Sequence, residues 1–99
     1  MPFSDDQREE NEKCFADFCS SECDRQQKLF LDGKNYEQLI PKKMTDTLEI
    51  WIDVYRGLKG QGFVIHAREL RDDGPWCRSI HIGNEPGVVD KAWHKYEVK

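Results

Sequence analysis

The side chains best suited to chemistry in this sequence are three histidines, His66, His81 and His94. His66 and His81 fall in two neighbouring segments with the composition of β-strands, and His94 falls in a third. Other side chains that could hold a proton or an anion accompany them: Arg68, Glu69, Arg78 and Tyr96. Because histidine exchanges protons near neutral pH, this set could perform general acid–base catalysis if the strands bring it together.

A helix followed by an antiparallel sheet with histidine and arginine on its open face is similar in architecture to small microbial ribonucleases and ribonuclease toxins. The resemblance implies that a carboxylate or histidine removes the 2′-hydroxyl proton, another histidine protonates the leaving group and arginine steadies the phosphate. No sequence motif is shared, and a net charge of -4 opposes an approach to RNA. The simpler interpretation is that these histidines and arginines are solvated or paired across strands.

The four cysteines, Cys14, Cys19, Cys23 and Cys77, are the second group with chemical potential. On a helix, Cys14 and Cys19 would point about 140° apart, so they could not share a metal ion. Cys19 and Cys23 are four residues apart and could bind zinc if a histidine from the sheet completed the site. Free cysteines are more often small core residues, and we expect no metal or cofactor. Without a secretory signal, a disulfide framework is not expected.

The elements that must position these side chains are centred on residues 47–83. Segments 47–56, 62–70 and 76–82 alternate apolar and polar residues with period 2, which predicts three β-strands. The Asp-Asp-Gly-Pro cluster before the third strand predicts a tight turn, so the three strands should form an antiparallel meander. A further alternation over residues 93–98 predicts a fourth strand at the edge of the sheet.

Residues 5–31 are predicted to form one long helix. Ser4 and Gln7 form a capping-box pattern at its start, and Gly33 supplies a stop at its end. Its apolar residues trace one stripe: Phe15, Phe18, Cys19, Cys23 and Phe30. The first three turns carry no such stripe, so we expect them to project into solvent or against a partner.

A second, short helix is predicted over residues 36–40, capped by Asn35 and ended by Pro41. Helices followed by strands predict one α+β domain over residues 1–99, with the long and the short helix packed on a three- to four-stranded antiparallel meander. The apolar runs are too short to span a bilayer and no secretory signal is visible, so we expect a cytoplasmic protein that does not enter a membrane.

Negative charge is concentrated in the N-terminal third of the chain. Residues 1–33 hold nine acids and four bases, a balance of -5, whereas residues 34–99 hold ten acids and eleven bases, a balance of +1. No dense basic patch is visible, so nucleic acid is not an expected partner.

Two surfaces are candidates for binding a protein partner with a basic surface. The first is the acidic helix, with Glu9, Glu10, Glu12 and Asp17, which would steer a basic partner. The second is the polar side of the strand 47–56, with Glu49, Trp51, Asp53 and Tyr55, because exposed aromatic residues among charges are typical of binding hot spots. The alternatives are a merely solvated helix face and aromatic residues covered by the segment around Trp93.

The sequence carries no Walker A loop, no dinucleotide-binding glycine fingerprint and no G-x-S-x-G elbow. We therefore predict a small acidic, non-enzymatic protein-binding module that inhibits a macromolecular target. In size, charge and lack of motifs it is similar to microbial inhibitors, immunity proteins and antitoxins, and to phage-encoded anti-defence proteins, which act in the host cytoplasm. The ribonuclease-like enzyme and a zinc module using Cys19 and Cys23 are the alternatives, and a homodimer through the long helix or the edge strand would also fit.

Overall fold

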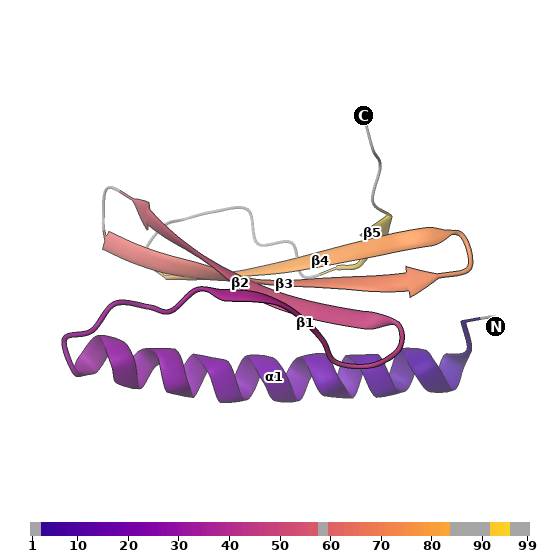
Figure 1. The fold of residues 1–99 in the computed structure, drawn as a ribbon, viewed down its shortest axis with the longest axis horizontal. Helices are drawn as coiled ribbons and strands as arrows, with labels where there is room; N and C mark the ends of the chain where they lie inside the picture. Colours follow the sequence, from indigo (N-terminus) through magenta and orange to yellow (C-terminus); the bar gives the residue numbers. More distant parts are fainter. Residues whose placement is uncertain (1–2, 58–59, 84–91, 96–99) are drawn as a thin grey trace.

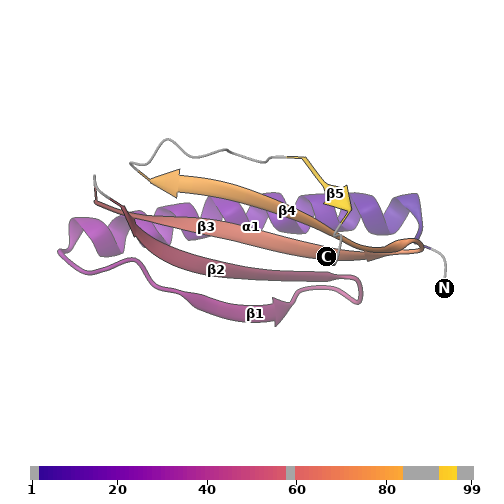
Figure 2. The same cartoon turned by 90° about the horizontal axis from the view of Figure 1, so that it is seen from above.

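The computed structural model describes residues 3–57, 60–83 and 92–95, and within them it shows one helix packed on one face of an antiparallel sheet (Figure 1). The elements in chain order are α1 (Asp5–Leu31), β1 (Leu39–Lys43), β2 (Leu48–Gly57), β3 (Gly60–Arg71), β4 (Gly74–Gly83) and β5 (His94–Lys95). The five strands lie side by side in the same order, with α1 running beneath them (Figure 2). The predicted α+β class and the antiparallel meander are therefore confirmed.

Local signals set both ends of α1 where the sequence predicts them. The Ser4 side chain accepts a hydrogen bond from the backbone N–H of Gln7, which satisfies a free donor of the first turn. At the other end, Gly33 has a φ of 79° and the N–H of Lys34 donates to the carbonyl of Leu29. No helix in the described part of the chain is both long and apolar enough to cross a membrane.

The sheet register places the apolar side chains of β2 and β3 against α1. Both hairpins are tight, because Gly57 pairs with Gly60 and Arg71 pairs with Gly74. Ile50 therefore lies opposite Ala67 on the face that α1 covers. The buried core consists of one helix residue and six strand residues: Phe15, Leu48, Ile50, Ile52, Phe63, Ile65 and Ala67.

The predicted short helix over residues 36–40 is wrong, because Leu39–Lys43 is the edge strand β1 and no helix forms before it. The reason is a contact with α1. The fully buried side chain of Gln26 donates to the carbonyl of Glu37 and accepts from its N–H, both at 2.8 Å. These bonds occupy the backbone groups of Glu37 as a neighbouring strand would.

The Tyr36 side chain is a second contact that fixes this segment, because its ring packs between Phe30 and Phe63. Because so short a helix has little stability of its own, these contacts decide the conformation.

The first turns of α1 do not project away from the molecule, as the sequence had suggested, but contact the sheet through polar groups. Asn11 is buried and its Nδ2 donates to Thr47 Oγ1 and to Glu69 Oε2, both at 2.9 Å. Glu69 is fully buried and also accepts from Arg71 Nε at 2.7 Å. A polar seam is invisible to a search for apolar stripes, so the sequence pattern missed it.

The edge strand predicted over 93–98 is present as β5, which pairs with β4 through Cys77 and His94 and through Trp76 and Lys95. Residues 96–99 lie outside the described part of the chain. Just before β5, the Trp93 ring lies 6.3 Å from that of Phe15, so this segment contributes to the core.

We expect Asn11→Ala to lower the free energy of unfolding by about 1–3 kcal/mol, because it leaves the buried carboxylate of Glu69 with one donor fewer. Urea unfolding followed by circular dichroism measures this change. Gln27→Ala, at an exposed position of the same helix, is the control and should have little effect. Equal stability of Asn11→Ala and the control would contradict the structural role of the polar seam.

Candidate partner-binding surfaces

The two surfaces predicted to bind a partner lie on opposite sides of the molecule. Ile50 and Ile52 face α1, and side chains alternate along a strand, so Trp51 and Asp53 point to the other face of the sheet. The outer side of α1 is separated from that face by the whole sheet (Figure 1). A single compact partner therefore cannot use both surfaces at once.

Three of the four predicted helix acids are exposed on the outer side of α1. Glu9, Glu10 and Asp17 are exposed, and none of them forms a hydrogen bond or ion pair with another residue that the structure describes. Glu12 differs, because it accepts from Arg78 Nη1 at 3.1 Å and also accepts from the indole N–H of Trp93. The sequence grouped it with the others because helical spacing alone does not show which cation of the sheet lies opposite.

A groove runs along one flank of α1 beside the turn that follows β1. Its volume is about 460 Å³. Its lining residues come from three turns of α1 and from that turn: Glu10, Lys13, Cys14, Asp17, Phe18, Ser21, Glu22 and Met44. Cys14, Phe18 and Met44 are half-buried and pack against the core, so they form an apolar floor. We call this feature the α1 groove.

The rim of the α1 groove is mainly acidic. Glu10 and Asp17 are unpaired within the described residues, and Glu22 is bonded to Arg25 at 2.9 Å. Among the described residues that line the groove, Lys13 is the one basic side chain. An acidic rim over an apolar floor suits a partner that presents a cation next to an apolar side chain. Phe18 and Met44 were not predicted as binding residues. The sequence pattern assigned Phe18 to the apolar stripe of the helix, and Met44 belongs to no pattern that indicates binding.

The free edge of β1 is poorly suited to pairing with another strand. Its register with β2 shifts between Leu39 and Lys42, as a β-bulge does. Pro41 has no N–H to donate, and Lys42 and Lys43 put two charges on the edge. These features oppose a homodimer through β1. The homodimer predicted through the edge strand 93–98 concerns the opposite edge of the sheet and stays a prediction.

On the opposite side, the open face of the sheet centres on His66. His66 Nε2 lies 3.0 Å from Asp53 Oδ2, and His66 Nδ1 lies 2.8 Å from Ser79 Oγ. The ring of Trp51 stacks on the imidazole, with centroids 5.2 Å apart. Two of the predicted binding residues, Trp51 and Asp53, are thus engaged with His66.

The other open-face residues are also in contact with one another. Glu49 forms an ion pair with Arg68 across the strands. The phenol of Tyr55 lies over Gly62, where an added Cβ would be 2.4 Å from the hydroxyl oxygen, so only glycine fits beneath it. The Tyr55 ring is also 6.1 Å from that of His81. The Tyr55 side chain therefore lies over β3, whereas Trp51 stacks side by side with His66 across the two strands.

The pKa of His66 is lowered from its ordinary value of 6.5, because burial disfavours the imidazolium more than Asp53 favours it. His66 is therefore neutral at neutral pH. With a carboxylate at Nε2, that nitrogen carries the proton and donates, which leaves Nδ1 to accept from Ser79. Such an imidazole can accept a proton from a hydroxyl group.

The structure brings only part of the predicted catalytic set together. His66, Arg68 and His81 share the open face, whereas Glu69 and Arg78 point to the face that α1 covers. His94 pairs with Cys77 in β5, and Tyr96 lies outside the described residues. The strand alternation in the sequence could already separate Glu69 and Arg78 from the histidines, but it could not show the partners of His66.

The helix cysteines are core residues in the described structure. Cys19 and Cys23 pack against the core, and burial raises the pKa of the Cys19 thiol to about 11. Among residues 3–57, 60–83 and 92–95, no group of three histidine, cysteine or acidic side chains is placed to hold a metal ion.

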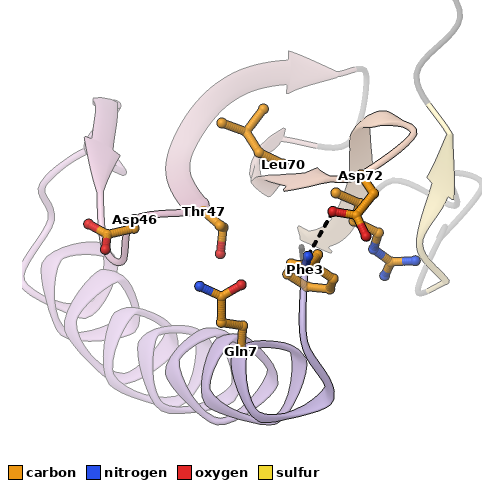
Figure 3. Close-up of a pocket in the computed structure, with 7 residues that line it drawn as sticks. Phe3, Gln7, Asp46, Thr47, Leu70 and Asp72 are labelled. Atoms are coloured by element: carbon orange, nitrogen blue, oxygen red, sulfur yellow. Dashed lines mark hydrogen bonds between the residues drawn. The ribbon is translucent and has the colours of Figure 1, made fainter. Parts of the chain in front are cut away.

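A second recess, of about 540 Å³, lies where the N-terminal segment meets the β3–β4 hairpin (Figure 3). The N–H of Phe3 donates to Asp72 Oδ1 at 2.7 Å, and the Arg71 guanidinium lies 4.4 Å from the centre of the Trp76 ring. Gln7 and Thr47 point toward one another across it. These contacts attach the start of the chain to the sheet, which is a structural role.

Comparisons with protein-family models, with curated proteins and with solved structures found no match to this chain.

We expect the wild type to lose more stability than His66→Gln when the pH falls from about 7.5 to about 5.5. The folded-state pKa of His66 is below 6.5, so the unfolded chain takes up the proton first and stability is lost as the pH falls through this range. Urea unfolding of both proteins at the two pH values measures the difference. An equal pH dependence of the two proteins would show that His66 is not held neutral.

Proposed function

We propose that this protein is a protein-binding module that inhibits a macromolecular target by occupying a basic surface on it. The observation that carries the proposal is the α1 groove, where exposed acids with no partner among the described residues adjoin an apolar floor. Glu10 and Asp17 border the groove, and Glu9 is a further exposed acid about 100° around the helix from Glu10. The apolar floor distinguishes this flank from a helix face that is only solvated.

The two parts of the surface have different energetic roles. Exposed ion pairs contribute about 0–1 kcal/mol each, so the acids mainly steer a basic partner and raise the association rate. Affinity comes mainly from covering apolar side chains in a well-packed pocket, and Phe18 and Met44 supply that apolar area in the groove. The open face is the weaker surface for this role, because Glu49 and Asp53 already have partners within the sheet.

Charge reversal of the flank tests the proposal. The triple variant Glu9→Lys, Glu10→Lys and Asp17→Lys should lose its partner when the tagged protein is used to capture proteins from a lysate of its native source, with quantitative mass spectrometry as the readout. All three side chains are exposed, so circular dichroism should show an intact fold.

The control is a second triple variant with the same net charge, whose reversed acids are exposed and line no part of the groove: Asp5→Lys, Asp32→Lys and Glu37→Lys. It should retain the partner that the wild type captures. If both variants capture that partner equally, the acidic flank is not the binding surface.

A second candidate function is the cleavage of RNA on the open face. The observation that favours it is the orientation of His66, whose Nδ1 is an acceptor and which lies near His81 and Arg68 on the same face. The 2′-hydroxyl would replace Ser79 at His66 Nδ1 and give its proton to that nitrogen. The resulting oxyanion would attack the phosphorus, and His81 as the general acid would donate a proton to the departing 5′-oxygen.

Purified protein should then cleave a short RNA, and the His66→Ala variant should cleave it at least about 100-fold more slowly than the wild type. Gln27→Ala, on the outer side of α1, should cleave as the wild type does. RNA that stays intact with the wild type would dismiss this second candidate and leave the binding proposal untouched.

A further inference from the structure

We propose that the α1 groove receives a single amphipathic helix of the partner, which lies along α1 with lysine or arginine on its flank and apolar side chains on its inner face. This inference rests on the proposed function of the same surface and specifies the element of the partner that fits it.

The groove favours a helix because its walls offer side chains and no free backbone. The backbone of α1 is hydrogen-bonded within the helix, so an extended segment lying along it would leave its own N–H and C=O groups without protein partners. A helix satisfies these groups internally and presents only side chains. Met44 lines the groove and follows directly on β1, whose bulge, Pro41 and two lysines oppose the addition of a strand.

The spacing of the lining residues defines the pattern that the partner must carry. Glu10 and Asp17 are seven residues apart, so they lie on the same side of α1 and about 10.5 Å apart along its axis. Cys14 and Phe18 occupy the adjacent row, nearer the core. A partner helix with two basic residues seven positions apart, and apolar residues three or four positions after each, would match both rows.

The same charges argue against a second copy of this chain as the occupant. Packing α1 against another α1 would place Glu10 and Asp17 opposite acids of the same kind, and like charges at short range oppose association. The basic residues of β1, Lys42 and Lys43, lie on a strand and cannot offer the helical pattern. The occupant is therefore a different, basic protein.

Two synthetic peptides with identical composition test this inference. In the first, lysines and leucines follow the helical pattern given above, and in the second the same residues alternate with period 2, as in a strand. Affinity for the purified full-length protein is measured by fluorescence anisotropy. The helical peptide should bind at least about tenfold more tightly than the alternating peptide.

The cysteines locate the bound peptide without any substitution. Cys14 lines the groove and Cys77 lies on the open face of the sheet, so Cys77 is an internal reference. The helical peptide should slow the alkylation of Cys14 and leave that of Cys77 unchanged, with mass spectrometry as the readout. Slower alkylation of Cys77 alone would place the peptide on the open face and overturn the inference.

Two variants test the two rows of the groove. Phe18→Ala should lower the affinity for the helical peptide about tenfold, whereas Phe30→Ala, near the end of the same helix, should leave that affinity unchanged. Because Phe18 also contacts the core, a second test leaves the apolar floor unchanged: the double variant Glu10→Gln and Asp17→Gln removes the two charges and should weaken peptide binding as well. Unchanged binding by the double variant would overturn the inference.

The outcomes separate this inference from the proposed function. Suppose that the two peptides bind with equal affinity and that Glu10→Gln with Asp17→Gln lowers both affinities. This result would overturn the inference that the partner segment is a helix, but it would support a basic partner at the groove. If neither peptide binds and charge reversal leaves capture unchanged, both proposals fail.

Discussion

Burial of the apolar face of β2 and β3 beneath α1 is the contact on which the rest of this structure depends. Phe15 is the one apolar helix residue in the fully buried core, and it packs among the strand residues Ile50, Ile52 and Ile65. One helix has to cover this face, because the structure shows no other helix in its described residues. The rotation of α1 about its axis is therefore set by the sheet, and that rotation decides which flank remains outside.

Polar contacts at both ends of α1 hold it in this orientation. Near its start, Asn11 donates a hydrogen bond to the buried carboxylate of Glu69. Burying that carboxylate without hydrogen-bond donors would cost free energy. Near its end, Gln26 binds the backbone of Glu37 and places β1 beside the helix. A hydrogen-bonded polar group tolerates less sliding than an apolar contact, so these two sites set the position of the helix along the sheet.

The orientation of α1 has a direct consequence for function. With Phe15 and Asn11 turned inward, Glu10 and Asp17 are left on the outer flank, and Cys14 and Phe18 lie between the acids and the core. The apolar floor and the acidic rim of the groove thus arise from the same packing that builds the core. The open face is different in kind, because His66, Trp51 and Glu49 have partners on the sheet and are held in place by them.

The sequence by itself determined the elements whose signals are local. Period-2 alternation marked β2, β3 and β4, while Ser4 and Gly33 marked the ends of α1, because these signals act within a few residues. It also located the acids of the helix. Only the tertiary structure decided that residues 39–43 form a strand, that Glu12 turns inward to Arg78, and that Asp53 and Ser79 hold His66. Each of these outcomes depends on a contact between residues far apart in the chain. The pattern of one segment contains no information on what another segment places against it.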